Sequence, residues 1–295
     1  MIRRREKFFS ALEGAVRTRG VALMGICNVT PDSFSDGGQY LTREAAFARV
    51  DALFAEGADM VDIGGESTRP RALPVSAKDQ LARAVDVVRY AAGKGAVSID
   101  TADPEVASAC FEAGASALND VSCLRNDELA RVTAQAGAAY VLMHSRGTQT
   151  EMKGFGEAPA DAYGDVVEDV LREWEEAAAR ARSSGVGSDA LVMDPGLGFA
   201  KAARHSMELL ARTRELALRA KVPVLIGASR KSFLRLVDAD ALPADRLGAS
   251  LAAAVYAARA GAQLLRVHDV RATKQALDLD RLLSPPKRDD EVSRA

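Results

Sequence analysis

The stretch Val222-Pro-Val-Leu-Ile-Gly-Ala-Ser-Arg-Lys-Ser-Phe233 contains the pattern on which the fold prediction rests. A short apolar run ends at Ile226, and a polar turn with glycine, two serines and two cations follows it. Near-continuous apolar runs of this length are typical of strands that are buried on both faces of a parallel sheet. Polar residues directly after such a strand are typical of ligand sites at the carboxyl ends of the strands.

The same pattern recurs along the chain, with longer amphipathic segments between the apolar runs. The apolar runs are residues 21–27, 60–63, 96–99, 115–118, 139–143, 190–193, 222–226 and 262–267. Segments with helical spacing include residues 42–56, 161–181, 205–220 and 245–260. Eight strand–helix units predict an α/β fold, and the polar residues after the strands favour a single (β/α)8 TIM barrel with parallel strands and an active site at the C-terminal face. An open doubly wound sheet would give much the same local pattern.

The composition limits the class of protein. The chain has 295 residues, of which 48% are hydrophobic, which suits one large barrel. Its 39 basic and 41 acidic residues give no reason to expect nucleic acid as a partner. No run reaches the roughly 20 apolar residues of a membrane span, and Glu13 and Arg17 interrupt the segment after the basic start, so we expect neither a membrane span nor a signal peptide. Three widely spaced cysteines favour free thiols and a cytoplasmic location.

The chain divides into three expected parts. Residues 1–20 are expected to form an N-terminal extension that packs on the barrel, and residues 21–283 to form the barrel itself. Residues 284–295 are polar and contain two prolines, so we expect a disordered tail.

Two loops are candidates for ligand binding. Residues 28–38 form a polar segment longer than the usual two to six residues of a βα turn, which favours a functional loop over an ordinary one. Residues 62–70 contain paired glycines, which allow a ligand to approach the backbone, and Arg69, which could hold an anion. A glycine-rich turn with a solvated arginine explains the second loop equally well.

Polar side chains also stand at the ends of other strands. Asp100, Asn119 and Asp194 could each be an ordinary helix cap, but together at one barrel mouth they could bind the edge of a flat heterocycle. Arg266 and His268 lie on the same side of the last strand and could hold a phosphate. The segment 229–232 is expected to open a helix whose free N–H groups bind an anion. These features indicate transfer chemistry on a phosphorylated substrate and leave the substrate unnamed.

Eight segments together resemble the dihydropteroate synthase family. They are residues 28–38, 62–70, 98–101, 119–121, 142–144, 194–199, 227–232 and 266–270. The resemblance runs in the same order over about residues 21–283. It implies that 6-hydroxymethyl-7,8-dihydropterin diphosphate is joined to p-aminobenzoate, with release of pyrophosphate, in folate biosynthesis. It also implies a dissociative substitution, a magnesium ion (Mg²⁺) as cofactor, a homodimer and a site of the kind that sulfonamides target.

The resemblance also implies roles for individual residues. The catalytic set is Asp100, Lys231, Arg266 and His268. The pterin-binding set is Asp100, Asn119, Met143, Asp194, Lys231 and Arg266. The diphosphate-binding set is Asn28, Arg69, Arg266 and His268, and Asn28 also binds Mg²⁺. The p-aminobenzoate-binding set is Phe34, Asp36, Thr68, Pro70, Phe199 and Ser232.

Three departures from the family pattern stand out. Ala200 occupies a position where the family usually has glycine, Lys78-Asp79-Gln80 replaces an acidic pair, and residues 145–150 are unusual. The alternatives to a synthase are a pterin-dependent corrinoid methyltransferase relative, a non-catalytic pterin-binding paralogue and a phosphate-binding isomerase barrel. The intact segments 28–38 and 229–232 favour the synthase over the methyltransferase relative. Only the completeness of the site argues against the non-catalytic paralogue, and the presence of Asp100, Asn119 and Asp194 together argues against the isomerase barrel. The Ala-rich segment 248–260 could pack against a partner helix.

Overall fold

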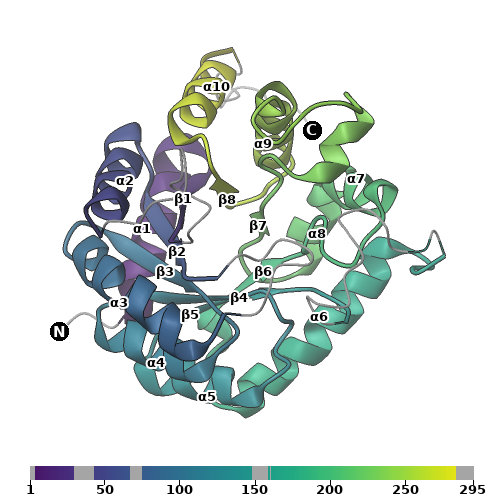
Figure 1. The fold of residues 1–295 in the computed structure, drawn as a ribbon. Helices are drawn as coiled ribbons and strands as arrows, with labels where there is room; N and C mark the ends of the chain where they lie inside the picture. The colour runs from purple at the N-terminus through teal and green to yellow at the C-terminus, as the bar shows by residue number, and fades with distance from the viewer. Residues whose placement is uncertain (1–3, 30–42, 67–74, 148–158, 160, 284–295) are drawn as a thin grey trace, which may run out of the picture.

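The computed structural model describes residues 4–29, 43–66, 75–147, 159 and 161–283. Eight parallel strands form a ring that is surrounded by helices (Figure 1). They are β1 (Ala22–Asn28), β2 (Met60–Gly64), β3 (Ala96–Asp100), β4 (Ala117–Asp120), β5 (Ala139–Met143), β6 (Leu191–Asp194), β7 (Leu225–Ile226) and β8 (Leu264–Val267). Their order is β6-β5-β4-β3-β2-β1-β8-β7, and a single parallel bridge between Met193 and Val224 joins the two end strands. The predicted (β/α)8 barrel is therefore confirmed.

Helices follow the strands in the order that the sequence predicts. They are α1 (Arg4–Arg19), α2 (Arg43–Glu56), α3 (Ala77–Ala92), α4 (Pro104–Glu112), α5 (Asp127–Ala136), α6 (Val166–Ser183), α7 (Ala203–Ala211), α8 (Thr213–Arg219), α9 (Leu247–Arg259) and α10 (Val270–Leu283). The described residues also form two short 3-10 helices, η2 (Ser188–Ala190) and η3 (Ser232–Leu236). Within the described residues, no helix is both long enough and apolar enough to cross a membrane.

Two predicted elements differ from the structure. The helix expected over residues 205–220 is two helices, because the backbone of Arg212 (φ −98°, ψ 22°) leaves the helical region between them. The strand expected over residues 222–226 is reduced to two residues. Pro223 explains part of that shortening, because it has no N–H to donate to the ladder.

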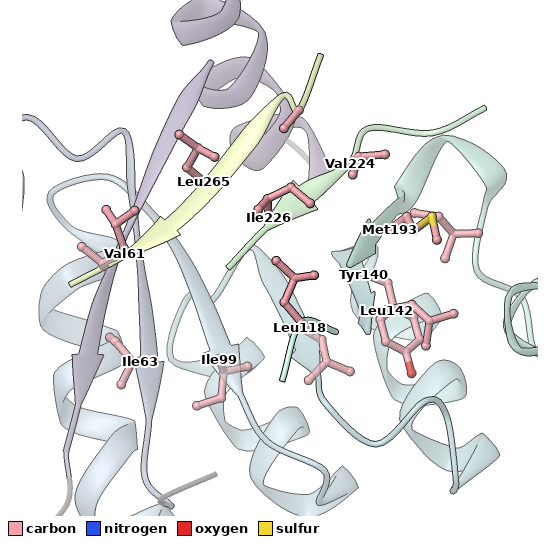
Figure 2. Packing of buried hydrophobic residues seen from close by; sticks show 14 of the residues in the cluster. Val61, Ile63, Ile99, Leu118, Tyr140, Leu142, Met193, Val224, Ile226 and Leu265 are labelled. Atoms are coloured by element: carbon pink, nitrogen blue, oxygen red, sulfur yellow. The ribbon is translucent and has the colours of Figure 1, made fainter. Parts of the chain in front are cut away.

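The side chains along each strand point alternately into two apolar cores, one between the strands and the helices and one inside the barrel. On β2, Val61 and Ile63 belong to the core between the strands and the helices, whereas Met60 belongs to the core inside the barrel. Figure 2 shows side chains of the outer core, among them Ile99 and Leu118 on the neighbouring strands. Because side chains alternate between the two faces of a strand, Asp62 points into the barrel like Met60.

Helix α1 covers the amino ends of the strands. The inner core has small residues at several strand positions, and Phe8 and Leu12 of α1 fill the space beside them. Arg4 donates hydrogen bonds to the last carbonyl groups of α4 and α5, and Lys7 donates to Ala92 at the end of α3. Cations are favoured at helix C-termini. This end of the barrel is therefore filled, and the opposite end is left for a ligand.

Candidate active site

The strand register brings three polar residues and a glycine, from four neighbouring strands, to one level at the carboxyl end of the barrel. Asn28 pairs with Gly64, Gly64 with Asp100, and Asp100 with Asn119. Gly64 has no side chain, and the Asn28 Oδ1 atom lies 3.6 Å from the position that a Cβ atom would occupy there. The side chain of Asn28 thus lies beside the strand that carries Asp100.

Arg266 joins the buried acids on the other side of the barrel. Its Nε atom donates to Asp62 Oδ2 at 2.6 Å, and its Nη2 atom donates to Asp100 Oδ2 at 2.8 Å. Asn119 Nδ2 also donates to Asp62 Oδ2, at 3.0 Å. A buried carboxylate is tolerated only where a cation and hydrogen bonds compensate the loss of water, and Arg266 supplies both.

Several buried oxygen atoms of this group lack a partner. The Oδ1 atoms of Asp62, Asp100 and Asn119 form no hydrogen bond within the part of the chain that the structure describes. All three residues are at most 3% exposed. Buried polar atoms normally have partners, so three such oxygens on adjacent strands indicate a place where a ligand donates hydrogen bonds.

Asp194 and Lys231 face the acids from the remaining strands. Lys231 Nζ donates to the carbonyl oxygen of Leu197 at 2.6 Å and lies 4.6 Å from the centroid of the Phe199 ring. Asp194 Oδ1 accepts from the backbone N–H of Gly196, at 2.7 Å. Met143 and Phe199 form a small apolar cluster at the same barrel mouth.

Burial changes the acidity of these groups. It raises the pKa of Asp100 to about 7, although the nearby Arg266 lowers it. Burial likewise raises the pKa of Asp194, against the attraction of Lys231. For Lys231, burial lowers the pKa to about 8, against the attraction of Asp194. Perturbed pKa values gathered in one concave site are typical of catalytic and ligand-binding centres.

Hydrogen bonds join the turn after β7 to the residues that follow β8. Ser229 Oγ lies 3.0 Å from His268 Nδ1 and also accepts from the His268 backbone N–H. Arg230, in the left-handed backbone region at φ 59°, donates through two nitrogens to the Asp269 carboxylate. The sequence predicted that an α-helix begins at this turn, and that prediction is wrong. The segment is the short 3-10 helix η3, so it offers no α-helical N-terminus to an anion.

Asp120 fixes a strained turn beside the same mouth. Cys123 and Leu124 both have positive φ values, 61° and 52°. The carboxylate of Asp120 accepts from Ser122, from the backbone N–H of Leu124 and from the Tyr140 hydroxyl. Positive φ is costly for residues other than glycine, so these hydrogen bonds hold a conformation that the chain alone disfavours.

The structure describes most but not all of the predicted site. It brings to the barrel mouth Asn28, Asp100, Asn119, Met143, Asp194, Phe199, Lys231, Ser232, Arg266 and His268. Five predicted residues lie outside the described residues: Phe34, Asp36, Thr68, Arg69 and Pro70. Among the residues that are described, no group of three or more His, Cys, Asp or Glu side chains could hold a metal ion.

The sequence interpretation missed two contributors. Asp62 lay within a quoted loop segment but was given no role, although it stands two residues before Gly64 and therefore on the inner face. The same alternation of side chains along a strand was used to predict that Arg266 and His268 lie on one side of the last strand. The carbonyl group of Leu197 carries no side-chain signal, so only the structure could reveal it as a partner of Lys231.

A family model described as pterin binding enzyme matches residues 24–268. A relative from Mycobacterium leprae, dihydropteroate synthase, is 45% identical over 264 residues, covering 87% of this chain and 91% of the relative. The chain belongs to the dihydropteroate synthase family. The resemblance seen in the sequence is thus confirmed.

Solved dihydropteroate synthases share the fold. The Xanthomonas albilineans enzyme with 4-aminobenzoic acid is 41% identical at a TM-score of 0.82, covering 90% of this chain and 93% of that one. The same enzyme with 7,8-dihydropteroate is 39% identical at a TM-score of 0.78, covering 90% and 94%. A Yersinia pestis dihydropteroate synthase with a sulfonamide drug is 36% identical at a TM-score of 0.82, also covering 90% and 94%.

Proposed function

We infer that the barrel mouth joins 6-hydroxymethyl-7,8-dihydropterin diphosphate to p-aminobenzoate, forming 7,8-dihydropteroate and pyrophosphate. One observation carries this inference within the family: among the described residues, Asp62, Asp100 and Asn119 each keep an oxygen without a partner, Arg266 bonds to the two acids, and Lys231 interacts electrostatically with Asp100. The pyrimidine edge of a pterin presents N–H donors and a carbonyl acceptor on one side. The acids and the amide match the donors, and Lys231 matches the acceptor.

The reaction breaks the bond between the pterin methylene carbon and the diphosphate oxygen. We propose that this bond breaks first, because the pterin ring delocalises the positive charge on the methylene carbon. The bond electrons leave with pyrophosphate in this first step, and the amine of p-aminobenzoate then attacks the methylene carbon and loses a proton. Arg266 and His268, with Arg69, are proposed to bind the diphosphate. Catalysis is then mainly positional and electrostatic, and it needs no nucleophilic side chain.

Mg²⁺ is proposed as the cofactor, with Asn28 as its protein ligand. The described residues offer this amide oxygen beside Asp100 and no cluster of three metal-binding side chains. That set fits Mg²⁺, which commonly uses few protein oxygens and keeps substrate oxygens and waters. Bound Mg²⁺ would neutralise charge on the departing diphosphate.

The arylamine is proposed to bind between the apolar cluster and η3. Phe199, 7% exposed beside Met143, supplies an aromatic wall, and Ser232 begins η3 next to Lys231. Phe34, Asp36, Thr68 and Pro70 are proposed to complete this part of the site. The structures of relatives with 4-aminobenzoic acid and with a sulfonamide drug support a site of this kind.

The experiment that tests this function measures pyrophosphate release with the pterin diphosphate, p-aminobenzoate and Mg²⁺ each omitted in turn. We expect release only with all three, and its loss in Lys231→Ala and Asp100→Ala. Binding of the pterin without release of pyrophosphate would instead indicate a non-catalytic pterin-binding paralogue. Methyl transfer to a corrinoid protein would indicate the methyltransferase alternative.

We further propose that the enzyme is a cytoplasmic homodimer. Exposed apolar side chains before and along α9 support a subunit interface, including Leu236, Val237 and Tyr256. Free thiols at Cys27, Cys110 and Cys123 support a reducing compartment. Light scattering tests the dimer, and a strictly monomeric mass would contradict it.

A further inference from the structure

A buried lysine lies next to the proposed pterin site without being assigned to it. Lys201 is 1% exposed and ends the loop between β6 and α7. Its Nζ atom lies 2.9 Å from His144 Nδ1, 3.1 Å from the Phe199 carbonyl oxygen and 3.4 Å from the His144 carbonyl oxygen. These three acceptors match the three N–H bonds of a protonated amine. They offset only part of the cost of burying its charge, because burial still lowers the pKa of Lys201 to about 7.

His144 is oriented by a carboxylate on its other side. Its Nε2 atom lies 3.0 Å from Glu173 Oε2, and Glu173 is paired with Arg146. Partial burial would raise the pKa of Glu173, but the hydrogen bonds from Arg146 and His144 outweigh it and hold that pKa well below its usual range. A carboxylate only accepts hydrogen bonds, so Nε2 carries the imidazole proton and Nδ1 accepts from Lys201. Glu173, His144 and Lys201 therefore form one directed chain of hydrogen bonds.

The loop that Lys201 anchors is packed tightly against His144. Gly196 (φ 69°) and Gly198 (φ 81°) have left-handed backbones, and a Cβ atom on Gly196 would come 2.0 Å from the His144 carbonyl oxygen. Ala200, immediately before Lys201, also has a positive φ of 49°. A loop with this backbone needs external fixing, and the contacts of Lys201 with Phe199 and His144 provide it.

The same loop holds the catalytic cation. The Leu197 carbonyl oxygen accepts the 2.6 Å hydrogen bond from Lys231, and the Phe199 ring lies against the Lys231 amine. A shift of this loop would therefore move both groups that fix Lys231. Among the described residues, Lys201 forms no hydrogen bond with Lys231 or with the partnerless oxygens of Asp62, Asp100 and Asn119.

We propose that Lys201, held by His144 and Glu173, is a positioning residue that fixes the β6–α7 loop so that Leu197 and Phe199 direct Lys231 at the pterin. The proposal rests on the proposed function and adds a residue to it. Because Lys231 binds the pterin, loss of Lys201 weakens pterin binding more than it slows the chemical step.

The decisive variant is Lys201→Met, which keeps the length of the side chain and removes the amine. We expect the KM for the pterin diphosphate and the Kd of 7,8-dihydropteroate, measured by calorimetry, to rise about tenfold, while kcat falls less than about threefold. A double-mutant cycle with Lys231→Met tests whether Lys201 acts on pterin binding through Lys231. In the Lys231→Met background, we expect Lys201→Met to raise the Kd less than about twofold further. Independent, multiplying effects of the two substitutions on Kd would overturn the proposal.

Substitutions at His144 test the proposal if Lys201→Met folds poorly. In His144→Asn the amide oxygen replaces Nδ1 as an acceptor, so we expect Kd within about threefold of the unsubstituted enzyme. In His144→Leu that acceptor is lost, and we expect the weakening seen with Lys201→Met. Equal Kd values for the two His144 variants would contradict the proposal. Lys94→Met, which removes a surface lysine paired with Asp51, is the matched control and should leave Kd unchanged.

Nitrogen NMR of the imidazole rings gives a readout that a general loss of stability does not move. The chain has three histidines, so the His144 signals are assigned by their absence in His144→Asn. We expect a protonated Nε2 and an unprotonated, hydrogen-bonded Nδ1, with the Nδ1 signal shifted in Lys201→Met. An unsubstituted enzyme that neither binds 7,8-dihydropteroate nor releases pyrophosphate would refute the proposed function. An active enzyme with a folded Lys201→Met variant of unchanged Kd would refute only this inference.

Discussion

Arg266 Nε donates a 2.6 Å hydrogen bond to Asp62 Oδ2, and the two residues are 204 positions apart in the sequence. The same oxygen of Asp62 also accepts from Asn119. Asp62 therefore orients two of the residues proposed to bind the pterin, while its other oxygen finds no partner among the described residues. We propose that Asp62 holds Arg266 and Asn119 in place before the substrate arrives.

Replacing Asp62 with Asn should lower kcat/KM for the pterin diphosphate about a hundredfold, because Arg266 loses a charged partner and a neutral amide oxygen accepts the hydrogen bonds of Arg266 and Asn119 more weakly than a carboxylate oxygen. The melting temperature should also fall, since breaking a buried ion pair costs about 3–5 kcal/mol. Steady-state kinetics and thermal unfolding measure the two effects. Asp86→Asn, which breaks only surface ion pairs with Arg43 and Arg89, is the control and should change neither quantity. A fully active Asp62→Asn variant would contradict this role.

The pKa shifts predict a bell-shaped pH profile for kcat/KM. Burial raises the pKa of Asp100 to about 7, so the carboxylate that accepts from the pterin is lost as the pH falls below that value. Burial lowers the pKa of Lys231 to about 8, so its charge is lost as the pH rises above it. Activity of the free enzyme should peak between these two values.

Asp100→Asn separates the two limbs of that profile. Its residual activity should lose the acidic limb and keep the basic limb, because residue 100 no longer titrates while Lys231 still does. The measurement is kcat/KM from about pH 6 to about pH 9. A profile of the unsubstituted enzyme that stays flat over this range would show that neither group titrates there.

Ala200→Gly should stabilise the protein. Ala200 has a φ of 49°, where a Cβ atom costs about 1 kcal/mol, and glycine removes that strain at a smaller entropic cost. Thermal unfolding should show a modest rise in the melting temperature. Ala252→Gly, an exposed site inside the α9 helix, is the matched control and should instead destabilise by about 1 kcal/mol. A lower melting temperature for Ala200→Gly would contradict the assigned strain.

Phe8→Ala should lower stability without changing the site. Phe8 is fully buried in the inner core at the end of the barrel away from the polar mouth. Removing its ring should destabilise by about 3–5 kcal/mol through lost burial and the cavity that remains. Denaturant unfolding measures the loss, and activity at a temperature where the variant is folded should be unchanged. A raised KM in the folded variant would show that this end of the barrel is coupled to the mouth.

The fold was predictable because strand burial and helix spacing act locally. The apolar runs at residues 60–63 and 96–99 begin at the first residues of β2 and β3, since strands buried on both faces must be apolar along their length. The break at Arg212 was not predictable, because the apolar spacing continues across it. The short β7 was partly predictable from Pro223, which was included in the run despite its missing N–H.

The site was predictable wherever its chemistry lies in side chains at strand ends. Asp100 and Asn119 prove to be neighbours in register, as strand-end positions suggested. The interactions of Lys201 and Leu197 could not be predicted from the sequence. The partner of Lys201 is 57 residues away, and Leu197 contributes only its backbone carbonyl group. Pattern reasoning identifies which residues are polar and inward, and only the folded chain shows which atoms still need a partner.

Strands β6 and β7 have the fewest paired residues in the barrel, and each leads to a residue of the proposed site. Between β6 and β7 there is one bridge, from Met193 to Val224. Asp194 ends β6, and Lys231 follows β7. A pterin held by both side chains therefore connects strands that the backbone connects only once, and its binding free energy opposes their separation. The amide of Met193, which donates to the Pro223 carbonyl oxygen between these strands, should then exchange its hydrogen with solvent more slowly when the site is filled, so that substrate completes the mechanical closure of the barrel as well as the chemistry.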